Sequence, residues 1–567
     1  MKHSKKKMIV ITAVLLAVLV VLGISLTKGK HETYAISGQA YGNSEEPLSD
    51  STFLPVKDTS ICISANEYAD EQQIIEKNVP QGYENPVVYL EAGDSLAFDV
   101  NVQTEGLYKI RIDYAIDENS NVDCALGLMQ NGEYPFEEAQ SIVLTQILKS
   151  GDYPFERDKN GNEIVPEVWT VPLWQSGNLR TLTQKTTDYL LFPMKKGVNS
   201  LKFEINSGKI YIGNIYLESP EDVPDFEEYS KQYSDDKGGD ALITIEGEQM
   251  TYKNSATPRA SSIRDVESVP YESNKYLMSA VGGETWQNNG EALYYKFNVE
   301  KEGWYQLSVK AKQSGQESSA DNTYIHKSVT IDGKVPFKEA GAMVFPSVTD
   351  WEVTTLGNGD QMYPFYLTEG EHYLGLEVDA TMYIPVAERI RELNDGVNDI
   401  ALEIRKLIGN NTDIYRDWEL EKYIPGISDK LNAIADGLEE QAAVLTEINM
   451  GQDKNKEITN LVICANQLRG LADDPNSIPN HMTVLSEGTG SVSQSLGEMT
   501  EGLVCQPLSV DQIYLAQKDA VIPEYRVSAM TSFVEGTKYF LSSFGDENKE
   551  DEQKEITVWV NRARNYI

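Results

Sequence analysis

A long segment of this chain repeats itself, and the repeat constrains the fold more than any other feature of the sequence. The stretch LMQNGEYPFEEA at 128–139 matches VTIDGKVPFKEA at 329–340. Upstream of these, EGLYKIRI at 105–112 matches EGWYQLSV at 302–309. Both segments consist of short runs in which apolar and polar residues alternate, separated by turn residues, a pattern typical of antiparallel sheets with one buried face. The sequence therefore predicts two tandem β-sandwiches between residues 58 and 384, related by duplication.

A third match indicates that the two copies differ in length. FPMKKGVNSLKFEI at 192–205 matches FYLTEGEHYLGLEV at 365–378, with an offset of about 170 residues instead of about 200. The first copy is therefore predicted to contain an insertion of about two dozen residues between 140 and 190. We place the first sandwich at 58–222 and the second at 240–384.

The hydrophobic period changes at Pro385. From there, apolar residues recur at alternating spacings of four and three, which indicates one apolar face of a helix. In the first such segment they are Val386, Ile390, Leu393, Val397, Ile400, Ile404 and Leu407. Prolines separate later segments that share the pattern. Residues 385–545 are therefore predicted to form an α-helical bundle with short connections, whose apolar faces make its own core.

The N-terminus carries a targeting signal. The basic segment 1–7 precedes an uncharged, apolar run at 8–27, long enough to span a bilayer with its N-terminus in the cytoplasm. A retained anchor and a secretory signal cleaved near Ala35 are the alternatives, and the length of the run favours the anchor. Residues 28–57 have the small and acidic composition of a tether. The sequence thus predicts a single-pass protein of the cell membrane whose bulk is extracellular.

Composition and motifs argue against several classes of function. The 88 acidic and 49 basic residues give a net charge of −39, which repels phosphate backbones, so nucleic acid is not expected as a partner. The histidines and cysteines show no metal-ligand spacing, and Cys464 with Cys505 either bridges two helices or leaves buried free thiols. The sequence contains no GxSxG, HExxH or phosphate-binding loop. We therefore predict a protein that is not an enzyme.

Tryptophans in loop-like segments are the candidate ligand-binding residues. The rings of Trp and Tyr can stack on the apolar faces of sugars while polar neighbours bind the hydroxyl groups. Four tryptophans lie in segments rich in Asn, Gly, Gln and Thr, namely Trp169, Trp174, Trp286 and Trp351. The alternative for each is a packing role. Trp304 lies in a clear strand pattern and is predicted to belong to the core.

Each predicted β-domain resembles the jelly-roll sandwiches of carbohydrate-binding modules. ITIEGEQM at 243–250 is similar to the "I-E-A-E" first strand of that group, and CISANEY at 62–68 is a weaker copy. In many such modules the second Glu of this strand and an Asp of the last strand share a structural calcium ion. The resemblance implies Glu248 and Asp379 as calcium ligands in the second sandwich. The last strand of the first copy, GNIYL, has no Asp.

The whole layout resembles the N-terminal half of large, cell-surface extracellular solute-binding proteins of ABC sugar importers in Gram-positive bacteria. After an acidic linker at 546–555, the segment 556–567 contains ITVWVNRARNY, which is similar to the opening strand of their solute-binding domain. The implied partners are an oligosaccharide or polysaccharide, the membrane, and an ABC permease contacted through a domain beyond this sequence. An edge strand added to another sheet is the alternative for the last segment.

The predicted fold class is therefore multidomain. It comprises an N-terminal transmembrane helix, two tandem all-β jelly-roll sandwiches, an α-helical bundle, and the first strand of a truncated α/β domain. Non-enzymatic capture of glycans or solutes at the cell surface is the leading functional hypothesis. The alternatives are the accessory carbohydrate-binding region of an anchored glycoside hydrolase and a structural surface stalk.

Overall fold

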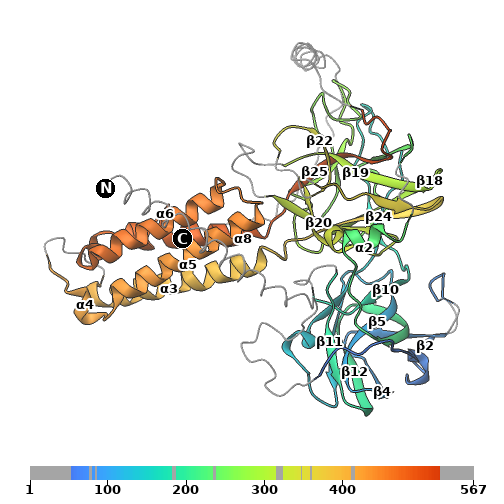
Figure 1. Cartoon of the computed structure of the whole chain (residues 1–567), viewed down its shortest axis with the longest axis horizontal. Coiled ribbons are helices and arrows are strands. Elements are labelled where there is room, and N and C mark those ends of the chain that lie inside the picture. Colours follow the sequence, from blue (N-terminus) through green and yellow to red (C-terminus); the bar gives the residue numbers. More distant parts are fainter. Residues whose placement is uncertain are drawn as a thin grey trace, which may run out of the picture.

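The computed structural model shows β-sandwiches and a helical bundle (Figure 1). It describes residues 53–523 except 76–78, 84–85, 182–186, 234–237, 314–323, 346–347, 358–360 and 410–415. The predicted basic segment, the anchor and most of the tether lie outside the described residues, as do the acidic linker and the terminal strand. Among the described helices, none combines the length and apolar character needed to cross a membrane.

The first sandwich packs two antiparallel sheets around one core. Apolar and polar residues alternate along its strands, which places the apolar ones on one face. In β4, SLAFDVNV, every second residue is buried. The larger sheet contains β1 (Ser60–Ser64), β2 (Ile74–Ile75), β3 (Val87–Glu91), β5 (Gly106–Ile116), β10 (Gln175–Asn178), β11 (Leu191–Met194) and β13 (Lys209–Glu218). The smaller sheet contains β4 (Ser95–Val102), β6 (Cys124–Gln130), β7 (Ile142–Leu144) and β12 (Gly197–Ser207).

The second sandwich has its own core and two seven-stranded sheets. Trp304 belongs to this core, as the strand pattern predicted. One sheet contains β14 (Leu242–Glu246), β16 (Ala260–Ser261), β17 (Ala280–Gly283), β19 (Gly303–Lys312), β22 (Glu352–Thr355), β23 (Phe365–Leu367) and β25 (Leu508–Ala516). The other contains β8 (Leu148–Ser150), β9 (Val168–Thr170), β15 (Tyr252–Lys253), β18 (Ala292–Val299), β20 (Ile325–Ile331), β21 (Met343–Phe345) and β24 (Gly370–Val378).

Strand order supports the duplication predicted from the repeats. The path β10-β5-β13-β3-β2 of the first sandwich corresponds to β22-β19-β25-β17-β16 of the second. Likewise β4-β12-β6-β7 corresponds to β18-β24-β20-β21. The hairpins after β6 and β20 turn through Asn131 and Asp332, with φ of 53° and 51°, and each is followed by a glycine with positive φ. The two copies therefore share both topology and turn chemistry.

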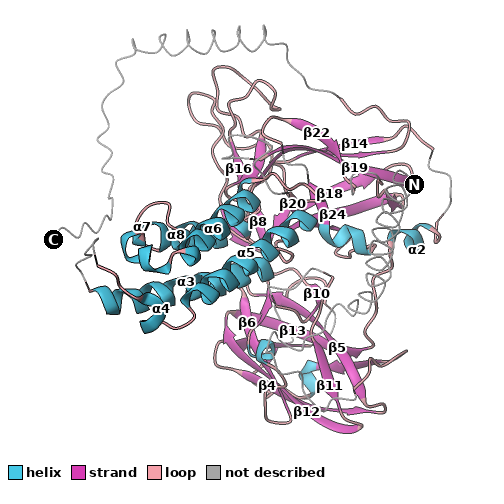
Figure 2. Cartoon of the chain, turned by 60° about the vertical axis from the view of Figure 1, so that its left-hand side comes forward, coloured by secondary structure: helices cyan, strands magenta, loops and turns pink. Residues whose placement is uncertain are grey.

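Four long helices make the bundle (Figure 2). The apolar positions predicted for its first helix pack inward, because three- and four-residue spacing places them on one face. Asn455 and Ser491 cap the third and fourth long helices by accepting hydrogen bonds from Ile458 N and Gln494 N. The helices are α3 (Ile384–Ile408), α5 (Ile427–Ile448), α6 (Lys456–Asp473) and α8 (Val492–Leu503), with short α4 (Leu420–Tyr423) and α7 (Met482–Leu485). All four cysteines, which include Cys464 and Cys505, are free thiols.

The bundle is inserted into the second sandwich, which differs from the predicted boundaries of 240–384 and 385–545. After α8 the chain returns as β25, between β17 and β19 of the same sheet (Figure 1, red among green). Its counterpart β13 follows β12 directly, through a turn at Gly208. All nine residues of β25 are buried, so the strand lacks the alternation that would distinguish it from a helical segment.

The predicted insertion of the first copy joins the two sandwiches. Its strands β8 and β9 pair with each other, and Leu148 of β8 pairs with Lys253 of β15, so they extend a sheet of the second sandwich. Between these strands, Glu163 accepts hydrogen bonds from Arg157 and from Met278 N of the second sandwich. A short helix, α2 (Phe226–Ser230), follows the first sandwich and packs its aromatic side chains on the core of the second.

Candidate functional site

Two of the four candidate tryptophans are buried in the second sandwich. Trp286 has no exposed surface, its Nε1 donates to Glu291 O at 3.0 Å, and Lys327 Nζ lies 3.6 Å from its ring centre. Trp351 is 6% exposed, with Lys312 Nζ 4.7 Å from its ring centre. Neither ring presents a free face, so both have the packing role that was the alternative for each.

Trp174 lies at the surface of the first sandwich but is half-buried. Its ring stacks on Tyr83, with ring centres 4.2 Å apart and planes at 25°. Its Nε1 donates to Pro80 O at 3.0 Å. One face of this indole is therefore occupied by a protein ring.

Trp169 is the exposed member of the set, at 48%. It lies on β9, at the edge of the sheet that the insertion extends, and pairs with Lys149 of β8. Cross-strand partners project from the same face of a sheet. Since Leu148 and Lys253 are a register pair and both are buried, Lys149 and Trp169 point to the outer face.

Two tyrosines continue this outer face across the sheet. Tyr252 precedes Lys253 and pairs with Tyr294 of β18, and Lys296, two residues further on β18, pairs with Tyr373 of β24. Alternation therefore places Tyr252 and Tyr373 on the same side as Trp169. We call Trp169, Tyr252 and Tyr373 the aromatic strip.

Two rings of the aromatic strip lie nearly parallel to each other. The Tyr252 and Tyr373 rings are 6.3 Å apart and within 24° of parallel. Trp169 stands two strands from Tyr252, which is about 10 Å at the usual separation of neighbouring strands. Both tyrosines are half-buried, whereas Trp169 is exposed.

The charged groups along the aromatic strip are paired. Lys149 Nζ lies 2.8 Å from Asp152, and Lys296 Nζ lies 2.8 Å from Glu371. The hydrogen bond to each acid raises the pKa of both lysines, so they remain protonated donors. The surface thus offers aromatic faces next to hydrogen-bonding groups without a large net charge, which suits a neutral polyhydroxylated ligand.

The sequence pattern indicated Trp169 as a candidate binding residue but did not indicate Tyr252 or Tyr373. The alternation in the strands that carry the two tyrosines was a usable signal, because it places each of them opposite the core. The association with Trp169 had no local signal, because it depends on a hairpin of the first copy joining a sheet of the second.

The two residues predicted to share a calcium ion have different partners. Asp379 follows β24, where its carboxylate accepts hydrogen bonds from Thr381 N and Oγ1. Glu248 is 2% exposed and lies near Glu246 and Asp511, whose charges add to burial in raising its pKa to about 8. The last strand of the second sandwich is β25, so its acidic residue is Asp511 and not Asp379.

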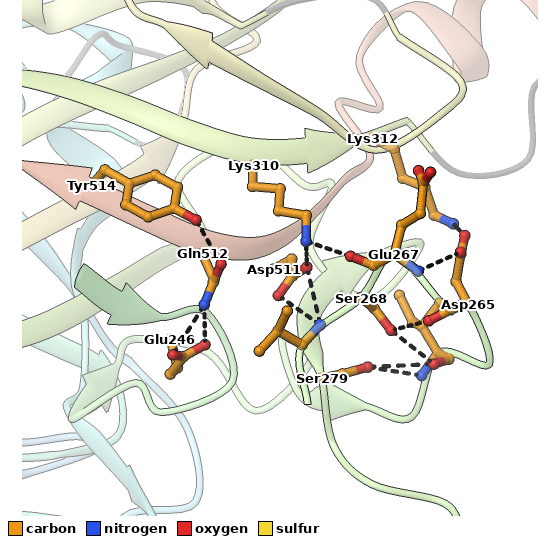
Figure 3. A network of polar contacts seen from close by, with 12 residues as sticks. Glu246, Asp265, Glu267, Ser268, Ser279, Lys310, Lys312, Asp511, Gln512 and Tyr514 are labelled. Carbon is orange, nitrogen blue, oxygen red and sulfur yellow. Dashed lines mark hydrogen bonds and ion pairs between the residues drawn. The ribbon is translucent and has the colours of Figure 1, made fainter. Parts of the chain in front are cut away.

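Buried polar groups surround Asp511 (Figure 3). Lys310 Nζ of β19 lies 2.8 Å from the Asp511 carboxylate and also donates to Glu267 O. Glu246 accepts from the amide of Gln512 at 3.0 and 3.1 Å. Both carboxylates thus face hydrogen-bond donors. Calcium prefers six to eight oxygen ligands, so this set does not fit a metal ion. Among the described residues, no cluster of three or more His, Cys, Asp or Glu side chains is placed to hold one.

One family model matches the bundle. Residues 385–503 match the model of the bacterial solute-binding protein, 4-helix bundle domain. The match runs from the second residue of α3 to the last of α8, which is the segment inserted between β24 and β25. Comparison with curated protein sequences found no match.

Solved structures give weaker similarities, to carbohydrate-active enzymes. A GH26-CBM35 β-(1,4)-mannanase of Podospora anserina is 14% identical over 30% of this chain and 29% of that chain, with a TM-score of 0.19. A cycloisomaltooligosaccharide glucanotransferase of Paenibacillus sp. is 9% identical over 57% and 47%, with a TM-score of 0.20. This chain thus spans less than half of either structure. TM-scores this low carry no argument about fold or function.

Proposed function

We propose that this chain captures glycans outside the cell as part of an extracellular solute-binding protein of an ABC importer, without catalysing a reaction. The observation that carries the proposal is the match of residues 385–503 to the solute-binding protein bundle. Membrane attachment through 8–27, and contact with a permease through a domain beyond this sequence, belong to the same proposal.

The aromatic strip is the surface proposed to bind the glycan. Trp169 supplies an exposed ring at the sheet edge, and the Tyr252–Tyr373 pair supplies a second platform further in. Stacking on an aromatic ring excludes water from the apolar face of a sugar, and the paired lysines and acids beside the rings can exchange hydrogen bonds with hydroxyl groups. Three rings spread over several strands suit an oligosaccharide or polysaccharide better than a single sugar.

A glycan array with the full chain in detergent, followed by calorimetric titration of the best ligand, tests this function. We expect Trp169→Ala to weaken binding about 10-fold or more, because loss of a stacking ring costs about 1.4 kcal/mol or more. Tyr423→Ala is the matched control, since Tyr423 is 57% exposed but lies on α4 of the bundle. Absence of binding to every glycan, or equal affinity in both variants, would contradict the role of the strip.

A rigid surface spacer is the second candidate. The pairing of β8 with β15 and the ion pair between Arg180 and Glu377 fasten the sandwiches to each other. Such fastening suits a stalk that holds another domain away from the membrane. A chain that binds no glycan but keeps its stability would favour this candidate.

A further inference from the structure

β25, the last strand of the second sandwich, contains a β-bulge at Asp511. Lys310 of β19 pairs with Gln512 of β25, but the next residue, Ala311, pairs with Val510. Asp511 is therefore the additional residue of β25 that has no partner on β19. A β-bulge changes the direction in which the side chain of its additional residue points. The β5–β13 pair of the first sandwich has a register shift at the corresponding place.

Two fully buried, oppositely charged side chains meet at this bulge. The side chains of Lys310 and Asp511 are 1% and 0% exposed, and their charged atoms are 2.8 Å apart. Asp511 Oδ1 and Oδ2 also lie 3.3 Å from Val269 N, which donates to the carboxylate. Lys310 Nζ donates in addition to the carbonyl of Glu267 (Figure 3). The ammonium thus bridges a carboxylate and a carbonyl, two ligand types that calcium uses in proteins.

Further acidic side chains surround the pair. Gly247 N donates to Asp511 O at 2.6 Å, so the two glutamates that flank Gly247, Glu246 and Glu248, lie beside the bulge. Glu248 is 2% exposed, and its Oε2 has no hydrogen-bond partner among the described residues. The buried Asp511 carboxylate thus has the Lys310 ammonium as its counter-ion, and burial and the two nearby glutamates raise the pKa values of the acids around it.

We propose that the Lys310 ammonium is the structural cation of the second sandwich, in place of the calcium that its first-strand glutamates predicted. Removing this ammonium leaves the buried Asp511 carboxylate without a counter-ion, and the oxygens around it are too few to bind calcium in its place. The proposal concerns the stability of the sandwich and does not depend on glycan binding.

The first sandwich has different side chains at the corresponding bulge, between β5 and β13, and this supports the inference. The register of β5 and β13 puts Asp113 where Lys310 stands and Gly213 where Asp511 stands. The Asp113 carboxylate accepts hydrogen bonds from Tyr216 Oη at 2.9 Å and Tyr83 Oη at 3.3 Å. Tyr83 also lies where a side chain on Gly213 would project. In each copy, side chains of the protein itself are the partners of the polar groups at the bulge. The charged residue is an acid, Asp113, on β5 and a base, Lys310, on β19.

Thermal unfolding of the wild-type chain gives the first test. We expect the same Tm in EDTA and in millimolar CaCl₂, because the cation is the Lys310 side chain, which a chelator cannot remove. A lower Tm in EDTA, or a rise with calcium, would overturn the proposal. This measurement needs no variant, so it stands even if substitutions at the site prevent folding.

The Lys310→Ser variant gives the second test. Its Tm in EDTA should fall by roughly 5–15 °C, because the buried carboxylate loses its partner. Millimolar CaCl₂ should restore none of this loss, because too few oxygen ligands remain for calcium. The matched control is Lys312→Ser, on the same strand and paired with Asp265 near the surface, whose Tm should fall less. A Lys310→Ser chain that keeps the wild-type Tm in EDTA, or that calcium returns to it, would overturn the proposal.

Discussion

Arg180 of the first sandwich and Glu377 of the second form an ion pair at 2.8 Å, and their side chains are 22% and 10% exposed. Beside them lie Tyr114 of β5 and Tyr294 of β18, and burial raises the pKa of both phenols. The two β-domains are therefore in contact through ordered side chains, in addition to the pairing of β8 with β15.

Arg180→Ala should destabilise the contact between the sandwiches. Glu377 would lose its partner while remaining mostly buried, which costs about 2–4 kcal/mol after allowance for the partial exposure of Arg180. Urea unfolding measures the cost, and limited proteolysis of the segment between the domains reports local opening. Arg389→Ala, which removes an exposed pair on α3, is the control and should cost less than about 1 kcal/mol. Equal losses in the two variants would mean that the contact contributes no special stability.

The second sandwich should lose stability as pH rises toward 8. Burial raises the pKa of Glu248 to about 8 and of Asp511 to about 6, whereas unfolded acids titrate near 4. The folded chain thus holds protons that the unfolded chain releases, so the free energy of unfolding declines between about pH 4 and pH 8. Urea titrations across this range measure the slope.

Glu248→Gln should flatten that dependence and raise stability at pH 8, because an amide does not ionise. The control is Glu352→Gln, an exposed position on β22. A slope that is identical in the wild type and in Glu248→Gln would show that Glu248 does not titrate in this range.

Leu515→Ala on β25 should weaken the bundle as well as the sandwich. Leu515 is fully buried and pairs with Ile243 and Leu307, so its truncation leaves a cavity that costs about 2–5 kcal/mol. Since β25 follows α8 directly, loosening it frees one end of the bundle. Hydrogen exchange should therefore show faster exchange in both units. Ile463→Ala, 48% exposed on α6, should change stability by less than about 0.5 kcal/mol. Unchanged exchange in the bundle would contradict the coupling.

Local patterns determined much of this protein. Alternation identified the strands of both sandwiches, the repeats identified the duplication, and three- and four-residue spacing identified the bundle with the core positions of α3. Each of these signals depends on which face of an element is buried. That property is encoded within a few neighbouring residues, so it is legible without knowledge of the partners.

The tertiary structure decided what depends on pairing between distant segments. β25 joins the second sandwich across the whole inserted bundle, and β8 of the first copy joins a sheet of the second. These pairings bury Asp511 beside Lys310 and place Trp169 on the same face as Tyr373. Likewise, Trp286 and Trp351 resembled binding residues in sequence but are packed by their folded surroundings. Hydrogen bonds between strands do not specify how far apart in sequence the strands lie, so only the folded chain selects these partners.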